Sequence, residues 1–340
     1  GLCKVYGTLT GNSSTITVGA LHLDGGTYSA PDSSGSTIIN DESGNQAFNN
    51  DGTFTNNGGT VTITTAGNSQ IDWIGTGSGN LNNLTYSGGA ILEWTVNGGT
   101  IDGNLNITNG TLQSSNGNKA LTVTGNVIVG DGTGSANTAI LGNASEEAAQ
   151  TFGSLTIDSD GKYNATSGTT TITSKTSDNY GIKGGGTFTH NNGEVKVTGN
   201  AFRFPIGATY YDFTWDTSSE PCYLYSTTLS GGATIDGTQN AGYTAILGTL
   251  KINDRGFVPY NATKVFINNL IIGDTTDSAN ATNFDMQDSD VFDGDVIVNN
   301  ILINADGQLK FGDNHAGNSD ALEVRGAFRS LGGASGVVVV

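Results

Sequence analysis

The side chains most able to do chemistry are five aspartates in one short segment. They occur in the sequence DMQDSDVFDGD and are Asp285, Asp288, Asp290, Asp293 and Asp295. Oxygen ligands at this density suit Ca²⁺, although the spacing matches neither an EF-hand loop nor the GGxGxD nonapeptide. A solvated loop of mutually repelling charges is the simplest interpretation. A calcium site is the main alternative, and a pair of catalytic carboxylates, as in enzymes that cleave polysaccharides, is the third.

A second unusual segment is rich in aromatic side chains. Residues 202–225 hold eight of the aromatic residues of the chain, which has 11 Tyr, 13 Phe and 3 Trp in all. Such rings would fill the core of a wider coil, which is the simplest interpretation. On an outer surface they would instead pack against a neighbouring subunit or stack on sugar rings. The residues that we consider for such outer contacts are Tyr210, Tyr211, Trp215, Tyr223 and Tyr225.

The histidines and cysteines follow no catalytic or metal-binding pattern. Cys3 and Cys222 lack the spacing of a metal site. Two free thiols, a disulfide within the chain and a disulfide between subunits all stay open for this pair. His22, His190 and His315 fit no Ser/His/Asp or Cys/His arrangement. We therefore predict no catalytic residues and expect that the chain is not an enzyme.

Composition excludes several classes of protein. The 340 residues include 52 Gly and only 4 Pro, and the formal net charge is −18. Nucleic-acid binders need clustered Lys and Arg, and this chain has no such cluster. It also lacks an apolar run long enough to span a membrane. The chain begins GLCKVYG, without the basic and apolar regions of a signal peptide, so we expect either a removed signal or a fragment.

Long-range repetition organises the sequence. The segment GTFTNNGGTVTIT at 52–64 returns as GTFTHNNGEVKVT at 186–198, with eight of thirteen positions identical. The tetrapeptide TIDG at 100–103 returns at 234–237 with the same offset of 134 residues. A later pair, VIVGDGTGSAN at 127–137 and LIIGDTTDSAN at 270–280, is offset by 143, which places an insertion after the second TIDG. We predict tandem units at about 19–152 and 153–299 and a partial third unit at 300–340.

The repeated segments read as short strands. Val61 and Ile63 alternate with Thr62, and in the second copy Val195 and Val197 alternate with Lys196. This period of two puts the branched residues in a core and the polar ones in solvent. His190 replaces Asn56 of the first copy, so we expect it in a turn.

No stretch has the 3.6-residue period of a long helix. The pattern favours an all-β fold, a parallel β-solenoid of roughly 15 coils that runs through residues 1–340, with stacked Asn and Thr side chains satisfying one another at its turns.

The repeats also resemble a known class of proteins. The segments at 52–64 and 186–198, LNNLTYSGG at 81–89 and LTVTGNVIVGDGTGSAN at 121–137 resemble the Gly/Asn/Thr-rich repeats of large microbial surface proteins and adhesins. Similar repeats occur in some phage structural proteins. The resemblance covers nearly the whole chain and implies a right-handed β-solenoid outside the cell. It identifies no catalytic residue.

We therefore predict a non-enzymatic extracellular structural protein, a subunit of a cell-surface filament, sheath or adhesin. The alternative is a phage tail-fibre or tailspike-like module that binds or cleaves glycans. Expected partners are copies of the chain itself, with surface glycans as further candidates and neither nucleic acid nor a membrane span. Ca²⁺ is the one cofactor considered. The β-branched residues Val337, Val338, Val339 and Val340 predict addition of strand edges between copies, with a buried last strand or an arbitrary fragment end as alternatives.

Overall fold

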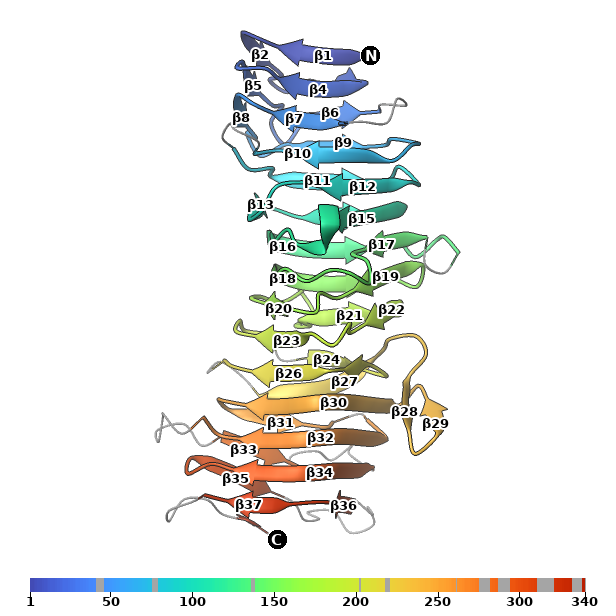
Figure 1. The fold of residues 1–340 in the computed structure, drawn as a ribbon, viewed down its shortest axis with the longest axis vertical. Coiled ribbons are helices and arrows are strands. Elements are labelled where there is room, and N and C mark those ends of the chain that lie inside the picture. Colours follow the sequence, from blue (N-terminus) through green and yellow to red (C-terminus); the bar gives the residue numbers. More distant parts are fainter. Residues whose placement is uncertain are drawn as a thin grey trace. The chain divides into compact units, whose positions relative to one another are not determined.

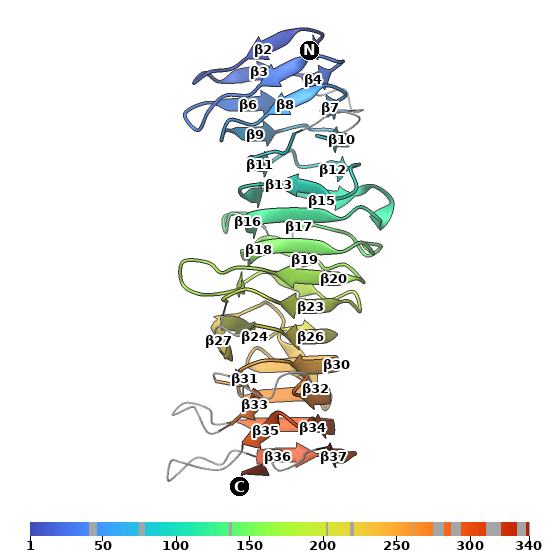
Figure 2. The ribbon, with the colours of Figure 1, turned by 90° about the vertical axis from the view of Figure 1, so that its left-hand side faces the viewer.

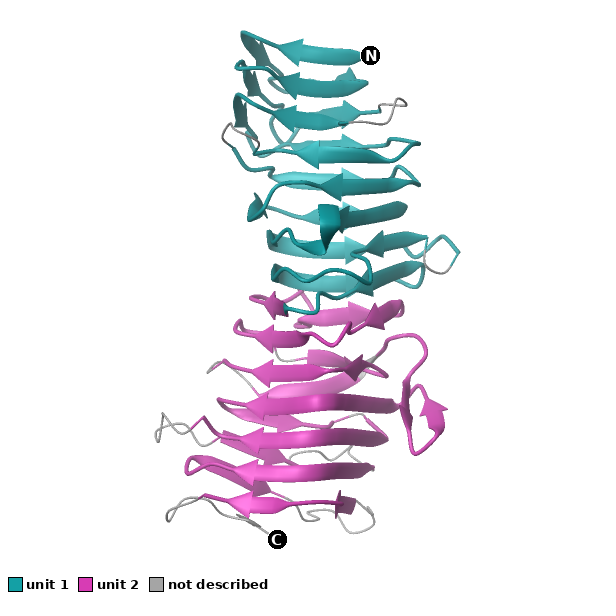
Figure 3. Cartoon of the chain, in the orientation of Figure 1, with its two compact units in different colours: residues 1–168 teal, residues 169–340 magenta. Residues whose placement is uncertain are grey.

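The fold consists of two compact units, Gly1–Gly168 (unit 1) and Thr169–Val340 (unit 2) (Figure 3). It is known from a computed structural model. The structure describes residues 1–40, 46–74, 79–135, 138–201, 203–217, 221–260, 262–274, 282–286, 294–310, 321–331 and 338–339. Each unit is a stack of short strands joined by turns, and strands of successive coils lie above one another (Figures 1 and 2).

Unit 1 has strands of three to nine residues and one 3-10 turn. Its elements are β1 Leu2–Val5, β2 Thr8–Thr10, β3 Ile16–Val18, β4 Ala20–Leu23, β5 Thr27–Ser29, β6 Ser36–Ile39, β7 Phe48–Asn50, β8 Thr53–Thr55, β9 Thr60–Ile63, β10 Ser69–Asp72, β11 Asn83–Tyr86, β12 Ile91–Trp94, β13 Gly99–Ile101, β14 Leu105–Ile107, β15 Gly110–Ser114, η1 Ser115–Gly117, β16 Leu121–Val129, β17 Ala139–Leu141, β18 Gln150–Ile157 and β19 Gly161–Asn164.

Unit 2 has strands of two to ten residues. Its elements are β20 Thr169–Ile172, β21 Ile182–Gly184, β22 Thr187–Thr189, β23 Glu194–Val197, β24 Arg203–Ile206, β25 Thr209–Tyr210, β26 Asp212–Trp215, β27 Cys222–Thr228, β28 Ala233–Ile235, β29 Thr238–Asn240, β30 Tyr243–Ile252, β31 Gly256–Val258, β32 Lys264–Ile272, β33 Thr282–Asp285, β34 Asp295–Ile303, β35 Gly307–Lys310, β36 Ala321–Val324, β37 Phe328–Ser330 and β38 Val338–Val339.

Apart from one antiparallel hairpin in unit 2, the strands of both units pair in parallel from coil to coil. In unit 1 one sheet follows β1-β4-β7-β10-β12-β15-β17-β19, and another follows β3-β6-β9-β11-β14-β16-β18. In unit 2 one sheet follows β20-β23-β26-β30-β32-β34 and another follows β24-β27-β31-β33-β35-β38. This pattern confirms the predicted all-β, parallel β-solenoid.

The solenoid has about 11 turns, so the expected number of roughly 15 was wrong. That number assumed 20–25 residues per coil, and several coils are longer. Asp212 and Thr249, which contact each other from adjacent coils, are 37 residues apart. Asn269 and Asn300 are 31 residues apart. The expectation of no long helix is confirmed, because the described residues contain only the 3-10 turn η1.

Alternation of apolar and polar residues places the core as predicted. Val61 and Ile63 are 3% and 0% exposed, whereas Thr62 between them is half-buried. The second copy behaves alike, with Val195 and Val197 buried on either side of Lys196. Because adjacent parallel strands are in register, each inward side chain stacks on its equivalent in the next coil, and a close-packed interior results.

Polar ladders of asparagine side chains accompany the apolar stacks. In unit 1 the backbone N–H of Asn104 donates to Asn83 Oδ1 at 2.8 Å, and that of Asn126 donates to Asn104 Oδ1 at 2.8 Å. In unit 2 the Asn300 amide donates to Asn269 Oδ1 at 3.0 Å, and its own oxygen accepts the N–H of Ala327 at 3.1 Å. Asparagines therefore stack from coil to coil, but Asn126, Asn269 and Asn300 lie within β16, β32 and β34 and not at the turns where such ladders were expected. Their side chains satisfy neighbouring hydrogen-bonding groups.

The repeated segment adopts one backbone conformation in both units. Asn57 and Gly58 have φ of 47° and 81°, and their counterparts Asn191 and Asn192 have φ of 47° and 60°. These positive values suit Gly and Asn, which reach the left-handed region most readily. The turn therefore has the same form in both copies, although only one of the two positions keeps its residue type.

The second TIDG segment is not the structural equivalent of the first. Thr100 and Ile101 lie in β13, which pairs in parallel with β16. Thr234 and Ile235 lie in β28, which forms an antiparallel hairpin with β29 around Asp236 and Gly237. The two TIDG segments therefore share an offset but not a strand pairing, and the position of the insertion stays a prediction.

The valine-rich segment at residues 337–340 is partly described. Val338 and Val339 form β38 and pair in parallel with Leu309 and Lys310 of β35 in the same chain. Val337 and Val340 lie outside the described residues. Addition of this segment to a second copy stays a prediction.

Candidate functional site

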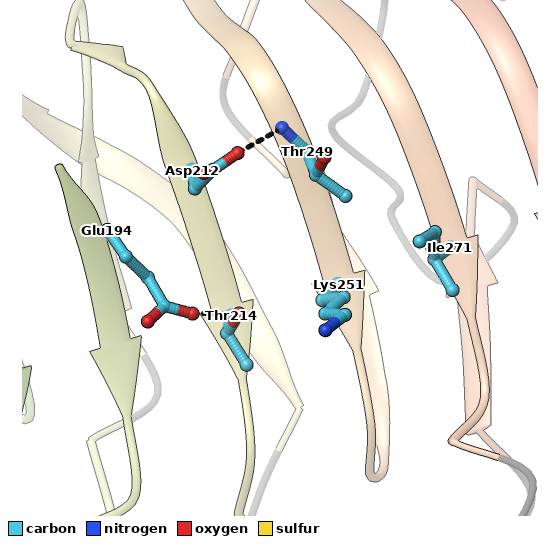
Figure 4. A pocket seen from close by; sticks show the side chains of 6 residues that line it. All are labelled: Glu194, Asp212, Thr214, Thr249, Lys251 and Ile271. Carbon is cyan, nitrogen blue, oxygen red and sulfur yellow. Dashed lines mark hydrogen bonds between the residues drawn. The ribbon is translucent and has the colours of Figure 1, made fainter. Parts of the chain in front are cut away.

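A shallow groove on the outer face of unit 2 is the best candidate site (Figure 4). Its volume is about 320 Å³. It crosses four neighbouring strands, β23, β26, β30 and β32, and its lining residues are Glu194, Asp212, Thr214, Thr249, Lys251 and Ile271. Thr214 is a short residue that is 5% exposed. Its neighbours in register on the adjacent strands are the longer Lys196 and Lys251, which leaves the groove between them.

Parallel register brings the two carboxylates of the groove together. Glu194 on β23 pairs directly with Asp212 on β26. Glu194 Oε1 accepts the Thr214 hydroxyl at 2.6 Å, and Asp212 Oδ1 accepts the backbone N–H of Thr249 at 2.6 Å (Figure 4). The second oxygen of Glu194, Oε2, accepts the Thr169 hydroxyl at 3.0 Å. Both oxygens of Glu194 and one oxygen of Asp212 are therefore held in place. The Lys251 ammonium adds an exposed positive charge to the same face.

Two exposed apolar side chains flank the groove at the bend of the same coils. Tyr211 precedes Asp212 and is 37% exposed, and Leu247 lies close to Thr249 in sequence and is 40% exposed. The backbone N–H of Gly248 donates to the carbonyl oxygen of Tyr211 at 2.8 Å, which joins the two segments. An aromatic ring and a branched aliphatic side chain thus stand next to carboxylates and hydroxyls.

His190 supports this bend from the preceding coil. Its ring stacks on the Tyr211 ring, with centroids 5.9 Å apart and an angle of 24° between the planes. Its Nδ1 accepts the backbone N–H of Asn192 at 2.9 Å, as Asn56 Oδ1 accepts that of Gly58 at 3.0 Å in the first copy. The expectation that His190 is a turn residue is confirmed.

This hydrogen bond makes stability depend on pH. Nδ1 accepts a proton-bearing N–H only in the neutral ring, and burial lowers the pKa of His190 below its ordinary value of about 6.5. As pH falls through about 6.5, the histidine of the unfolded chain takes up a proton before that of the folded chain does. The free energy of unfolding therefore falls as pH falls. In His190→Asn the residue is the one that the first copy has at this position. We expect this variant to lose less stability than the wild type between pH 7.5 and 5 in urea titrations. Identical pH profiles would contradict this role of His190.

Two of the five aromatic residues considered for outer contacts are instead core residues. Tyr210 and Trp215 are 1% and 0% exposed, which corrects their assignment to a contact surface. Trp215 alternates with Thr214 and so points inward with Phe213, two residues before it. The alternation in DFTW was the signal that could have shown this. Tyr211 does not follow this alternation, because it lies at the bend, where successive residues no longer alternate.

Tyr223 and Tyr225 lie on the outer side of β27 but are largely engaged by their neighbours. Tyr225 stacks on Tyr260 with centroids 5.3 Å apart and planes 3° apart, and the Arg203 guanidinium lies 4.2 Å from its centroid on the same outer surface. Tyr223 meets Tyr260 edge-on at 6.0 Å. Such stacking and cation–π contacts stabilise a strand face. This cluster therefore has a structural explanation.

The other predicted site residues do not come together. Cys3 and Cys222 are both free thiols, so the structure contains no disulfide between them, and burial raises the pKa of Cys222. Asp285 pairs with Lys310 at 3.1 Å and Asp295 with Lys264 at 3.6 Å.

The predicted calcium site lies largely beyond the structure. Asp288, Asp290 and Asp293 are outside the described residues, so this site stays a prediction. Within the described ranges, no group of three or more His, Cys, Asp or Glu side chains is arranged to hold a metal ion.

Unit 1 has a carboxyl group that the sequence did not indicate. Glu146 is fully buried and accepts the backbone N–H of Ser114 at 2.9 Å and its hydroxyl at 2.7 Å. Burial raises the pKa of Glu146, and the two Ser114 bonds oppose that rise. The carboxyl points inward, and the depression of about 650 Å³ beside it is lined by neutral residues. We interpret Glu146 as a clamp between the segments at 114–117 and 143–149.

No helix in the described part of the chain is long and apolar enough to cross a membrane. No protein-family model, no curated protein and no solved structure matches the chain.

Proposed function

We propose that this chain is a non-enzymatic structural protein of a cell surface, built as a repetitive scaffold in a filament, sheath or adhesin. The winding that we propose is the right-handed one that the resemblance to surface-protein repeats implies. The β-solenoid provides long, regular outer faces on a close-packed core, and its outer side chains are mainly uncharged or acidic. Both properties suit a protein that separates or displays other groups.

One observation carries the proposal: the repeat keeps the contacts that build the scaffold, even where residue types change. Between the two copies it keeps the backbone conformation of a turn, and it keeps an acceptor for the same N–H even where Asn56 becomes His190. It also keeps a contact between an aspartate and the preceding coil. The N–H of Asp131 donates to Asp160 at 3.3 Å, and that of Asp274 donates to Asp306 at 3.3 Å. Repetition of supporting contacts favours a scaffold over repeated catalytic sites.

Location and activity test this proposal separately. We expect antibodies against the purified chain to label intact, unpermeabilised cells of its source, and protease added outside the cells to remove the label. Labelling only after permeabilisation would contradict a surface protein. We also expect the purified chain to release no new reducing ends or unsaturated products from neutral and acidic polysaccharides. Negative-stain microscopy of the same preparation distinguishes a filament from single adhesin-like particles.

A further inference from the structure

We propose that the groove of unit 2 and the bend beside it bind a neutral sugar unit of a glycan. The site comprises Glu194, Asp212, Thr214, Lys251, Tyr211 and Leu247. It goes beyond a structural role, because a scaffold needs neither a hollow on a strand face nor exposed apolar side chains at one bend. It can also fail independently of the surface location proposed above.

The chemistry of the site fits a pyranose ring. A pyranose carries hydroxyls around its edge and C–H groups on its faces. Asp212 offers acceptors along the groove, Lys251 offers a charged donor, and hydrogen bonds to charged groups are the stronger ones. Tyr211 offers an aromatic face for the C–H groups, and the stacked His190 ring supports it from behind. The volume of about 320 Å³ is at the lower end for small-molecule sites, as expected for one or two sugar rings.

The charges of the site favour a neutral sugar over an acidic one. The groove is lined by two carboxylates, Glu194 and Asp212, and by one ammonium group, that of Lys251. Lys196 lies on the same face, but its charge is balanced by Asp216, 2.7 Å away. The whole chain carries a formal net charge of −18, which repels polyanions. A uronic acid polymer would therefore meet a repulsive surface.

Backbone geometry argues against a peptide in the groove. Peptides that bind sheets usually add a strand to a free edge. The strands β23, β26, β30 and β32 are each paired on both sides, so their backbone groups are already bonded. Recognition in this groove must come from side chains, which suits a hydroxyl-rich ligand.

Calorimetric titration of the full chain with six-sugar probes tests the proposal. The neutral probes are cellohexaose, chitohexaose, maltohexaose and mannohexaose, and hexagalacturonate is the acidic probe. We expect at least one neutral probe to bind, and hexagalacturonate to bind at least about tenfold more weakly than it. Asp212→Asn keeps an acceptor for the Thr249 N–H but loses the charge, so it should weaken the neutral probe at least about tenfold.

Two further variants keep the result decisive. Tyr211→Ala removes an exposed ring and should also weaken binding at least about tenfold, while Tyr6→Ala removes a ring that is 68% exposed in unit 1 and should change nothing. Binding of none of the neutral probes would overturn the proposal. So would tighter binding of hexagalacturonate, or equal affinities of the wild type, Tyr211→Ala and Asp212→Asn.

Discussion

Replacing Trp215 by alanine is expected to lower the free energy of unfolding by about 3–5 kcal/mol. Trp215 is completely buried in β26, and its in-register neighbours in the adjacent coils are Val197 and Ile252. Its ring meets that of Phe204 at right angles with centroids 5.9 Å apart. The substitution removes a large ring from a stack whose backbone spacing is fixed by parallel pairing, so the cavity cannot close easily.

The matched control for Trp215→Ala lies four residues earlier. Tyr211 is exposed and contacts the His190 ring, so Tyr211→Ala should cost only about 0.5 kcal/mol. Repeat arrays often unfold in parts. The measurement therefore combines urea titration with native-state hydrogen exchange of the Val197 and Ile252 amides. If both variants lost similar stability, Trp215 would not be the core residue that its burial indicates.

The fold class could be predicted from the sequence because its signals are local. The alternation of Val61 and Ile63 with Thr62 has a period of two, and the core face follows from that period without knowledge of neighbouring strands. The turn at Asn57 and Gly58 is equally local, since it depends on residue types that tolerate positive φ. Both features recur in the second copy, so the two copies support the same interpretation independently.

The candidate site could not be predicted because it depends on how coils neighbour one another. Asp212 and Thr249 meet across 37 residues, and the hairpin formed by β28 and β29 accounts for part of that distance. Sequence spacing alone gives no register across such an insertion. The same limit affected the number of coils, since a constant coil length was assumed. Acidic density drew attention to residues 285–295, whereas the groove pairs only two carboxylates, from different strands.

Gly161→Ala, which adds a single methyl group, has the next largest expected effect. We expect it to lower the free energy of unfolding by about 3 kcal/mol. Gly161 begins β19 immediately after Asp160, whose carboxylate accepts the N–H of Asp131 from the preceding coil. A Cβ at position 161 would overlap the carbonyl oxygen of Val129, which accepts the N–H of Asp158 at 2.8 Å. Because the backbone fixes the position of the Cβ and the obstacle is a backbone oxygen, no side-chain rotation relieves the overlap, and the two coils must separate locally.

Gly7, which has no such obstacle, provides the control. Gly307, which follows an aspartate in unit 2 as Gly161 does in unit 1, provides a second test. Gly7 is exposed and a Cβ there would meet nothing within 4 Å, so Gly7→Ala should be neutral or stabilise by up to about 1 kcal/mol. Gly307 of unit 2 meets the carbonyl oxygen of Ile272 in the same way as Gly161 meets that of Val129, so Gly307→Ala should be destabilising as well. Urea titration of the three variants decides the point. Equal midpoints for Gly161→Ala and Gly7→Ala would mean that the coils can part at no cost. A loss for both Gly161→Ala and Gly307→Ala would instead show that the close approach of coils at this glycine is a property of the repeat itself.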